Sequence, residues 1–407
     1  MFHNIIIVND NCSIKGGADA VAINSAVGLA KKGINVVFFA GADPISEKLI
    51  DAGVTVVCMN QKDILHDENR FRAIKKGIYN NDARKKFASL LSKYSAKDTI
   101  VHIHTWTKLL SSAVFDVAAM NGFKTVLTLH DFFTVCPNGG LYNYNTEKIC
   151  HHNPMSLKCI FTNCDLRSYV HKLWRIIRQF VQNSKFNRID NLYLLAVSQK
   201  VADLVGSYMQ KRRTNIQILH NPIEILQTET LASSNRTKYL FMGRLAKEKG
   251  PDLFCETITQ LGLNGVVVGD GYMRRELEAK YPNIEFAGWL SGNEKLNVIR
   301  ECKCFVFTSK WYEAFGLVVA EMKALGIPAI VPLESAAAEQ IEDGVDGLLY
   351  KIGDVDSLKE ALQKFEGMSI KNMYDNTLRS FDESVYSIDS YINNLITIYS
   401  SLITNSI

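Results

Sequence analysis

Two glutamates, Glu313 and Glu321, lie eight positions apart in the stretch "KWYEAFGLVVAEMKALGIPAIV". An ionised carboxylate can only accept hydrogen bonds, so hydroxyl groups are its natural ligands. We expect a helix that begins near Phe315, whose unpaired amides at the positive end could hold a phosphate. The residues around this helix start are Ala314, Phe315, Gly316 and Leu317. The two glutamates would then face one ligand, although a capping glutamate followed by an exposed helical one gives the same pattern.

A second stretch, "FMGRLAKEKG", places cations where a strand ends. The strand ends at Gly243, and Arg244 and Lys249 flank a short loop before Pro251, which suits the first turn of a helix. Cations at the carboxyl end of a buried strand suit a diphosphate. Two solvated surface charges would give the same sequence. A further strand, "GVVVGDG", adds Gly269.

The front half of the chain offers a matching half-site. "KGGADAVAI" places Gly16 and Gly17 between the first strand and its helix, where backbone amides can approach an anion. "VLTLHDFF" places His130 and Asp131 at the end of another strand. A Gly-Gly pair also serves any tight turn, and a loop histidine is often only hydrogen-bonded. A position at the mouth of a cleft makes a catalytic role for His130 as plausible as a structural one.

The elements that must position these residues alternate regularly. Apolar runs on consecutive positions, typical of strands buried on both faces, are separated by helical segments. In the front half the runs are "NIIIVND", "INVVFFAG", "TIVHIHTW", "KTVLTLH", "LYLLAVS" and "IQILHNP". In the back half they are "YLFMGR", "GVVVGDG", "IEFAGWL", "CFVFTSK", "IPAIVPL" and "GLLYKI". The pattern predicts two doubly wound α/β domains with the site in a cleft between them.

Domain boundaries follow from chain length and from one polar stretch. A chain of 407 residues favours two domains over one. The segment "IEILQTETLASSNRTK" predicts a linker over 223–237, between an N-terminal domain of residues 1–222 and a C-terminal domain of residues 238–384. A last helix, from about 385 to 407, carries apolar residues at helical spacing.

The composition is that of an ordinary globular protein, with 47% hydrophobic and 22% charged residues and no run of the roughly 18 apolar residues that a membrane span needs. The start, "MFHNIIIVND", has no basic segment before its apolar run, so we expect a first strand, no signal peptide and a cytoplasmic protein. Through Asp190 the chain carries 24 Lys+Arg against 15 Asp+Glu, and the remainder carries 22 against 27. The basic front half favours an anionic surface or acceptor there, or reflects drift in surface charge.

Residues 166–183, "LRSYVHKLWRIIRQFVQN", form an amphipathic pattern. The expected apolar face consists of Leu166, Tyr169, Val170, Leu173, Trp174, Ile177, Phe180 and Val181. The expected cationic face consists of Arg167, Lys172, Arg175 and Arg178. Such a helix commonly packs its apolar face on the domain core, but a basic helix with a tryptophan can also lie on an anionic membrane. The positive charge of the front half favours contact with a membrane or acceptor through these cations and Trp174.

Nine cysteines, an odd number in a chain without an export signal, argue against a disulfide framework. Four of them, Cys136, Cys150, Cys159 and Cys164, lie within 29 residues beside two histidines. A structural zinc that holds this insertion is one explanation. Because the spacings are wider than the usual Cys-x2-4-Cys pair, unligated thiols in a loop fit them better.

Together these motifs resemble glycosyltransferase family 4, whose members have the two-domain GT-B architecture. The resemblance spans nearly the whole chain. Its specific part is "GRLAKEKG" followed by "SKWYEAFGLVVAE", which matches the family's Glu-x7-Glu signature, with "GDG" between them. It implies two Rossmann-like domains that face each other across a deep cleft, with the last helix packing back on the first domain.

The resemblance also implies roles for the candidate residues. Such enzymes transfer a sugar from a nucleoside diphosphate and retain its anomeric configuration. Arg244 and Lys249 would neutralise the departing diphosphate, helped by backbone amides of both half-sites. Glu321 would hold the ribose hydroxyls and Glu313 a hydroxyl of the donor sugar, while His130 would lie near the anomeric centre.

No cofactor is implied for catalysis, and the resemblance requires no divalent metal. The chain has one Asp-x-Asp sequence, Asp354 and Asp356, in "KIGDVDSLKEAL". There Asp356 fits a helix cap better than a metal ligand.

The favoured function is a retaining glycosyltransferase that builds a bacterial surface polysaccharide such as O-antigen or capsule on a polyprenyl-diphosphate-linked acceptor. A UDP-sugar is expected before a GDP-sugar, the inner face of the cytoplasmic membrane is the expected location, and no nucleic acid is expected as a partner. A soluble sugar or glucan synthase of the same architecture is the rival enzyme. A catalytically silent GT-B binding or chaperone subunit is the rival of another class, and the intact set of charged residues argues against it. Donor sugar, base, acceptor and oligomeric state are not specified by the sequence.

Overall fold

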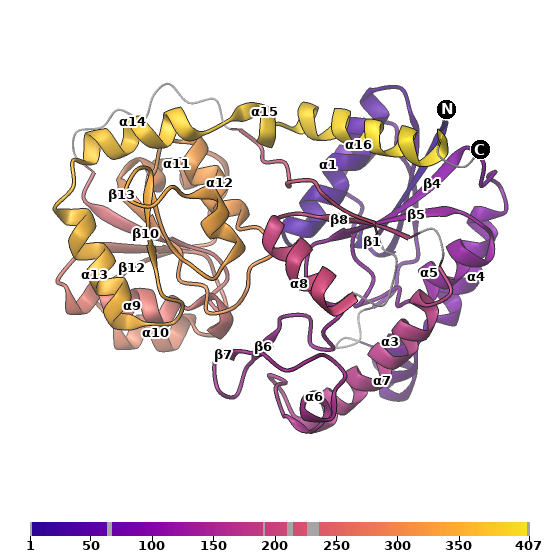
Figure 1. Cartoon of the computed structure of the whole chain (residues 1–407), viewed down its shortest axis with the longest axis horizontal. Coiled ribbons are helices and arrows are strands. Elements are labelled where there is room, and N and C mark those ends of the chain that lie inside the picture. Colours follow the sequence, from indigo (N-terminus) through magenta and orange to yellow (C-terminus); the bar gives the residue numbers. More distant parts are fainter. Residues whose placement is uncertain (1, 63–66, 190–191, 210–214, 226–235, 405–407) are drawn as a thin grey trace. The chain divides into compact units, whose positions relative to one another are not determined.

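A computed structural model describes residues 2–62, 67–189, 192–209, 215–225 and 236–404 of the chain. The chain divides into two compact units (Figure 1). Unit 1 comprises Met1–Gly139, His152–Pro222 and Ser387–Ile407, and unit 2 comprises Gly140–His151 and Ile223–Tyr386. Most of the expected linker, residues 226–235, lies outside the described residues.

Unit 1 is built on a seven-stranded sheet in the order β3-β2-β1-β4-β5-β8-β9, in which every pair is parallel. Its strands are β1 (Asn4–Asn11), β2 (Asn35–Ala42), β3 (Thr55–Cys58), β4 (Thr99–Ile103), β5 (Lys124–Leu129), β8 (Leu192–Ala196) and β9 (Asn215–Ile218). The six front-half strands predicted from apolar runs are confirmed. The edge strand β3 was not predicted, because its four residues are short of a full apolar run and mostly half-buried.

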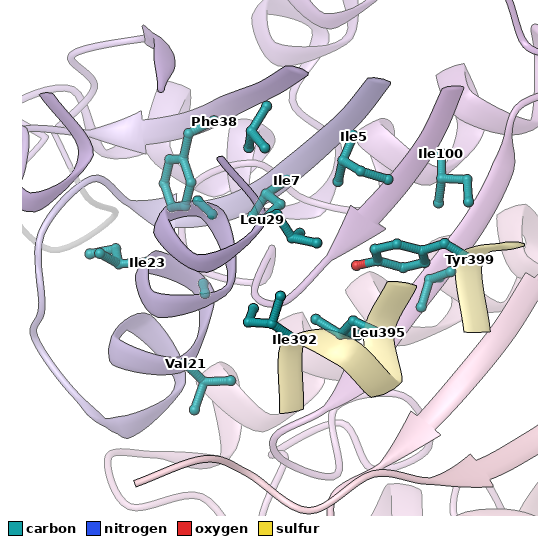
Figure 2. Close-up of a cluster of buried hydrophobic side chains, with 14 of the residues drawn as sticks. Ile5, Ile7, Val21, Ile23, Leu29, Phe38, Ile100, Ile392, Leu395 and Tyr399 are labelled. Carbon is teal, nitrogen blue, oxygen red and sulfur yellow. The ribbon is translucent and has the colours of Figure 1, made fainter. Parts of the chain in front are cut away.

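The helices of unit 1 cover this sheet. They are α1 (Gly17–Lys31), α2 (Glu47–Asp51), α3 (Arg70–Ile78), α4 (Asn81–Leu91), α5 (Ala113–Met120), α6 (Leu157–Phe161), α7 (Tyr169–Phe186), α8 (Gln199–Met209) and α16 (Ile388–Thr404). One core cluster joins β1, α1 and α16, as Figure 2 shows for Ile5, Leu29 and Leu395. Consecutive apolar residues in β1 are therefore buried on both sides of the strand, as a parallel sheet requires.

The terminal helix α16 packs on α1 and becomes part of the core of unit 1. The two helices approach closely at Gly28, where an added Cβ would lie 2.5 Å from Cγ1 of Ile392. The hydroxyl of Tyr399 lies 2.5 Å from Nδ1 of His102 in β4. The last helix of the chain thus completes the hydrophobic core that the first strand and the first helix begin.

Unit 2 contains a six-stranded parallel sheet in the order β12-β11-β10-β13-β14-β15. Its strands are β10 (Lys238–Met242), β11 (Gly265–Val268), β12 (Glu285–Gly288), β13 (Cys302–Val306), β14 (Ala329–Pro332) and β15 (Gly347–Tyr350). Its helices are η1 (Lys247–Lys249), α9 (Pro251–Gln260), α10 (Arg274–Lys280), α11 (Gly292–Arg300), α12 (Leu317–Ala324), η2 (Ala336–Gln340), α13 (Val355–Glu366), α14 (Ile370–Ser380) and α15 (Glu383–Tyr386). All six strands predicted for the back half are confirmed.

A small antiparallel hairpin also belongs to unit 2, although the sequence places it inside the front half. Its strands are β6 (Tyr142–Asn143) and β7 (Lys148–Ile149). Glu147 in the hairpin turn forms ion pairs with Lys247 and Lys310, each at 3.0 Å. These pairs explain why residues 140–151 join the second unit.

Two sequence expectations about helices need comment. Asp354 caps α13, accepting hydrogen bonds from the amides of Asp356 and Ser357, so the predicted cap at Asp356 is wrong by two residues. Among the described helices, none combines the length and the apolar character that crossing a bilayer demands.

We predict that Leu395→Ala lowers the free energy of unfolding of unit 1 by about 2–5 kcal/mol, because it leaves a cavity in a fully buried core. Denaturant unfolding followed by tryptophan fluorescence and circular dichroism measures the change. The neighbouring exposed residue serves as the control, and Asn394→Ala should stay within about 0.5 kcal/mol of the parent. Equal effects of the two substitutions would contradict the packing of α16 described here.

Candidate functional site

Glu313 lies at the centre of a hydrogen-bonded network in unit 2. Its Oε1 accepts from Nζ of Lys249 at 2.6 Å, from Oγ of Ser309 at 2.5 Å and from Nε1 of Trp311 at 2.9 Å. The Lys249 ammonium also lies 5.4 Å from the ring centre of Trp311. All three donors reach one carboxylate oxygen, and no hydrogen bond to Oε2 occurs among the residues that the structure describes.

The network keeps Glu313 charged although its side chain is only 12% exposed. Burial by itself raises the pKa of this carboxyl. The adjacent Lys249 ammonium and the hydrogen bonds from Ser309 and Trp311 outweigh burial and hold the pKa of Glu313 below its usual value. The site therefore presents a fixed carboxylate beside a fixed ammonium.

Lys249 is positioned by the turn that connects η1 to α9. Gly250 adopts φ +65°, and an added Cβ would lie 2.1 Å from the carbonyl oxygen of Thr308, so only glycine fits. The Thr308 hydroxyl donates to the Gly250 carbonyl at 2.8 Å. A second contact joins the same two loops, an ion pair between Lys310 and Asp252 at 2.6 Å. The loop of Lys249 and the loop of Glu313 are thus bound to each other through several independent contacts.

Arg244, the other predicted cation, is the more accessible of the two. Its guanidinium is 63% exposed and pairs at 2.5 Å with Glu248, whose side chain is 3% exposed. Next to Arg244 in the chain, the backbone amide of Leu245 donates a hydrogen bond to the carbonyl of Asp270 at 2.9 Å. Glu248 therefore orients Arg244 while leaving most of the guanidinium open to a ligand.

The helix after Glu313 begins two residues later than predicted. α12 starts at Leu317, with Gly316 as its N-cap at φ +87° and without any side-chain cap. An added Cβ at Gly316 would lie 2.7 Å from Cβ of Ala337, so glycine is required by both backbone and packing. The amide of Gln340 donates to the Phe315 carbonyl at 2.7 Å and fixes the approach to the helix. The first-turn amides at Leu317 and beyond remain suited to an anion.

Glu321 lies in the second turn of α12 and pairs with Lys295 of α11 at 2.9 Å. Its side chain is 30% exposed, so the carboxylate remains reachable by a ligand. Glu313 and Glu321 are brought to the same helix end, one before it and one within it, as predicted from their spacing. Their partners differ, because Glu313 is held by three donors and Glu321 by one.

Gly269 and Gly243 lie at the carboxyl ends of two neighbouring strands, β11 and β10. Gly269 adopts φ +138°, and an added Cβ there would lie 1.9 Å from the Gly243 carbonyl oxygen. The backbones of the two loops therefore lie so close together that no side chain fits between them at Gly269. The predicted donor-binding residues of unit 2 lie on loops, in η1 and in the first two turns of α12, all at the carboxyl end of its parallel sheet.

In unit 1, the predicted glycine turn leads into α1. Gly16 is its N-cap in an extended conformation that any residue could adopt, and an added Cβ would meet nothing within 4 Å. Asp19 in the first turn is buried and accepts from Asn9 at 2.8 Å and from the amide of Lys15 at 3.1 Å. The hydrogen bonds to the buried Asp19 therefore hold the loop before Gly17 in place. No atom fills the position of a Cβ at Gly16.

His130 ends a row of three histidines on the neighbouring strands β4 and β5. Its Nε2 lies 2.9 Å from Nδ1 of His104, with the rings stacked, and the His104 ring lies 4.2 Å from that of His102. Burial lowers the pKa of His130 and of His102 to about 3, and that of His104 also lies well below its usual value. The imidazole of His130 is therefore neutral at physiological pH.

Asp131, next to His130, receives the amide of Phe133 at 2.9 Å. Burial raises the pKa of this carboxyl to about 6 despite that hydrogen bond. Asp10, at the end of β1, is buried and accepts the amides of Lys108, Leu109 and Leu110 at 2.9–3.1 Å. Asp10 thus anchors the loop that follows β4, next to His104.

Of the two orientations that the sequence left open for the amphipathic helix, packing of its apolar side on the core is not the one observed. In α7, Lys172 and Arg178 are buried, whereas the exposed side carries Val170, Ile177 and Phe180. The reason is the loop after β5, whose backbone carbonyls need donors. Three side chains of α7 donate to carbonyls of this loop: Arg178 to Pro137 at 2.8 Å, Gln179 to Thr134 at 3.2 Å and Gln182 to Phe133 at 2.8 Å. Gln182 in turn accepts from Nε1 of Trp106 at 3.0 Å.

Lys172 and Arg178 therefore cannot serve as the membrane or acceptor contacts that their sequence pattern suggested. Arg175 is half-buried and pairs with the buried Asp165 at 2.7 Å. Trp174 donates to the Ile74 carbonyl of α3 at 3.2 Å. Of the predicted set, Arg167 is exposed.

The described residues give no support to a zinc ion at the cysteine cluster, which was the less favoured explanation of the sequence. Among the described residues, no three His, Cys, Asp or Glu side chains come together as metal ligands. Instead, Nζ of the buried Lys172 lies 3.2 Å from Sγ of Cys164 and 3.6 Å from Sγ of Cys159. Cys136 contacts Asn138, and Cys150 belongs to unit 2. An ammonium in contact with two thiols repels a metal cation from that position.

Several residues of the site were not anticipated from the sequence. Ser309 and Trp311 could have been found, since they stand only four and two positions before Glu313 in the same loop. Lys295 could not, because it reaches Glu321 from another helix 26 positions away. His104 likewise meets His130 only because β4 and β5 are neighbours.

Two family models match the chain. The model of Glycosyltransferase Family 4 matches residues 15–225, and the model of Glycosyl transferases group 1 matches residues 223–377. The first of these covers just over half of the 407 residues. The two matches meet close to the boundary between the front and back halves.

Relatives and solved structures agree with these models. A GDP-mannose-dependent alpha-mannosyltransferase of Corynebacterium glutamicum is 34% identical over 122 residues, 30% of this chain and 29% of the relative. A UDP-Gal:alpha-D-GlcNAc-diphosphoundecaprenol alpha-1,3-galactosyltransferase of Escherichia coli is 24% identical over 193 residues, 44% of this chain and 49% of the relative. The chain thus spans less than half of either relative. Sucrose-phosphate synthase from Thermosynechococcus elongatus shares the fold, with a TM-score of 0.72 and 15% identity over 99% of this chain and 100% of that one. The predicted fold class, two Rossmann-like domains of GT-B type, is confirmed.

We predict that Lys249→Met raises the pKa of Glu313, because burial then acts without an opposing cation. NMR titration of labelled glutamate side chains measures this pKa. Since the parent carboxyl has a lowered pKa, its stabilisation is present above the unfolded pKa of about 4.3 and lost as pH falls. The variant should therefore be less stable by roughly 3 kcal/mol at neutral pH, with the difference shrinking in acid. Lys364 is an exposed lysine of the same unit, and Lys364→Met is the control. It should change neither the pKa of Glu313 nor the free energy of unfolding.

We also predict that His130 does not titrate between about pH 5 and 8. Because the pKa of the folded group is lowered, stability is full above the unfolded pKa of about 6.5 and falls as pH drops below it. His130→Gln should reduce the pH dependence of unfolding between about pH 4 and 6 by about 1.4 kcal/mol per pH unit. An imidazole NMR titration with a midpoint near neutrality would contradict the buried neutral ring.

Proposed function

The chain belongs to glycosyltransferase family 4, and on that basis we propose that it transfers a sugar from a nucleoside diphosphate to a lipid-linked glycan with retention of anomeric configuration. The observation that carries the proposal is the Lys249–Glu313 pair beside the uncapped start of α12. It offers a cation and amides for phosphate and a carboxylate for hydroxyls within one buried network. A diphosphate sugar needs all three.

The leaving group is the centre of the proposed mechanism. Negative charge builds on the diphosphate as the glycosidic bond breaks, and donors fixed in advance stabilise that charge most. Lys249 is fixed by Glu313, and Arg244 is oriented by the buried Glu248. The amides at Leu317 and beyond add neutral donors at the positive end of α12. These groups together supply positive charge without a metal ion.

The two glutamates hold hydroxyl groups in this proposal. Glu321, partly exposed beside Lys295, accepts from the ribose. Glu313 uses Oε2 to accept from a hydroxyl of the donor sugar, because Oε1 already receives three donors. Since the ionised carboxylate is the stronger acceptor for a hydroxyl, the lowered pKa of Glu313 preserves this strong acceptor in mild acid.

His130 of unit 1 contacts the sugar near the anomeric centre in this proposal, and Gly17 contributes an amide to the diphosphate. A neutral imidazole can donate or accept a hydrogen bond without adding charge next to an oxocarbenium-like centre. The contact with His104 fixes the ring orientation. The proposal assigns no residue as a covalent nucleophile that would account for retention of configuration.

The donor base is proposed as uridine, with guanosine second. The Escherichia coli relative is named for UDP-Gal and a diphosphoundecaprenol acceptor, and the Corynebacterium relative for GDP-mannose. A lipid-linked acceptor of that kind, as in O-antigen or capsule assembly, would place the enzyme at the inner face of the cytoplasmic membrane. The fold likeness to sucrose-phosphate synthase keeps a soluble sugar synthase as the second candidate. A silent binding subunit is disfavoured by the complete network around Glu313.

We predict that UDP or GDP raises the melting temperature of the purified chain, and that Lys249→Ala and Arg244→Ala each lower kcat about 10²–10³-fold. Thermal-shift screening with both nucleotides and their sugar conjugates identifies the base, and release of free nucleotide measures turnover. Lys364→Ala is the matched control. Turnover with a water-soluble acceptor and none with a lipid-linked one would favour the soluble synthase, whereas the absence of any nucleotide shift at millimolar concentration would reject the transferase proposal.

A further inference from the structure

Helix α7 of unit 1 presents an apolar stripe to solvent. Val170, Leu173, Ile177 and Phe180 are exposed, and so is Leu166 just before the helix. Their spacing of alternately four and three residues places them on one side of the helix. Val170 and Phe180 are 74% and 70% exposed. A stripe of this kind is ordinarily buried in a core.

Two short helices, α3 and α6, contact α7 (Figure 1) and also expose apolar side chains. α3 exposes Phe71 and Ile74, and α6 exposes Leu157 and Phe161. The hydrogen bond from Trp174 to the Ile74 carbonyl joins α3 to α7. We call the eight exposed side chains of these three helices, together with Leu166 just before α7, the apolar face: Phe71, Ile74, Leu157, Phe161, Leu166, Val170, Leu173, Ile177 and Phe180. Exposed apolar surface on this scale marks an interaction site.

The exposure is built into the packing of α7. Its opposite side is occupied by Lys172, Arg178, Gln179 and Gln182, all buried. Rolling the helix to bury Phe180 would leave the loop carbonyls and these side chains without partners, at a cost typical of buried unsatisfied polar groups. The polar contacts of the inner side therefore hold the apolar side outward.

Cations surround the apolar face, and exposed carboxylates are absent from its helices. Residues 156–189 contain seven Lys or Arg and one acid, Asp165, which is buried and paired with Arg175. Of the seven cations, Lys172 and Arg178 are buried and Lys185 pairs with Asp116. α3, "RFRAIKKGI", contains four cations and no acid, and two of them are paired, Arg72 with Asp67 and Lys76 with Asp82. Lys75, Lys158 and Arg167 are exposed, one on each of α3 and α6 and one at the start of α7. The partner of this surface must be both apolar and anionic.

We propose that the apolar face docks on an anionic lipid bilayer, with the apolar side chains in the headgroup boundary and Lys75, Lys158 and Arg167 on lipid phosphates. This docking rests on the proposed function in one respect: an enzyme that acts on a lipid-linked acceptor must reach the bilayer that holds the acceptor. A second copy of the chain is a poorer occupant, since it would bring the same positive charges face to face. A bilayer supplies apolar depth and negative charge together.

The test measures binding of the full purified chain to vesicles by sedimentation. Vesicles of phosphatidylcholine alone are compared with vesicles of equal parts phosphatidylcholine and phosphatidylglycerol. The parent should bind the anionic vesicles and release at high salt. Val170→Glu with Ile177→Glu should weaken this binding at least about tenfold, since two charges must then enter the boundary.

A charge variant and a matched control separate the two contributions. Replacement of Lys75, Lys158 and Arg167 by glutamine should weaken binding to anionic vesicles on the order of a hundredfold at low salt, because each cation near such a surface contributes about a factor of five. Ile50→Glu changes a 61% exposed apolar residue of α2, outside the apolar face, and should bind as the parent does. Circular dichroism and the nucleotide-induced thermal shift confirm that each variant is folded.

Three results overturn the docking surface: equal binding to both vesicle types, parent-like binding by the Val170→Glu, Ile177→Glu variant, or loss of dimerisation as its only effect in analytical ultracentrifugation. A dimer broken by these substitutions without vesicle binding would assign the face to a second copy. Turnover of nucleotide sugar with a water-soluble acceptor is measured in parallel. Vesicle binding without turnover would reject the proposed function alone, and turnover without vesicle binding would reject the docking surface alone.

Discussion

A parallel sheet must be covered on both faces, and this requirement organises the whole chain. Each unit meets it with helices that alternate with strands, so every strand ends at the same edge of its sheet. In unit 1 the alternation is insufficient, and α16 returns from the end of the chain to complete the core around Leu395. The loops that carry the candidate site then lie at strand ends, where the backbone is not committed to the sheet.

The site in unit 2 depends on charges that are paired before any ligand arrives. Lys249 is paired with Glu313, Arg244 with Glu248, and Lys295 with Glu321. Pairing lets a partly buried charge persist at low cost, because each ion has a partner in place of water. It also fixes each group in space, so that the proposed donor would bind with little reorganisation of these side chains. Glycines at the turns, such as Gly250 and Gly316, allow the loops to approach closely enough for these pairs to form.

Helix α7 shows how backbone demands can overrule a hydrophobic pattern. The loop after β5 is buried and irregular, so its carbonyls require donors. Arg178 and Gln182 supply them from the inner side of α7, and Lys172 contacts two thiols deeper in the same layer. The apolar side of the helix is left outside as a consequence. The same arrangement that completes the interior therefore creates the surface proposed to meet a bilayer.

The sequence by itself determined the two-sheet architecture and identified the charged residues of the candidate site in unit 2. Strands such as "NIIIVND" and "GVVVGDG" are recognisable because burial on both faces demands consecutive apolar residues. Glu313 and Glu321 were found because their spacing is local to one helix start. The tertiary structure alone decided the partners of these residues, since Lys295 reaches Glu321 from a separate helix and His104 reaches His130 from a neighbouring strand.

It also decided the direction in which α7 faces, which amphipathic periodicity cannot specify. Periodicity separates the two sides of a helix but does not say which side meets the protein. That choice depends on what the neighbouring segment leaves unsatisfied, and here the neighbour is a loop that needs hydrogen-bond donors. The surroundings of the clustered cysteines were beyond the sequence for the same reason, because the buried ammonium of Lys172 comes to two of them only in the folded chain.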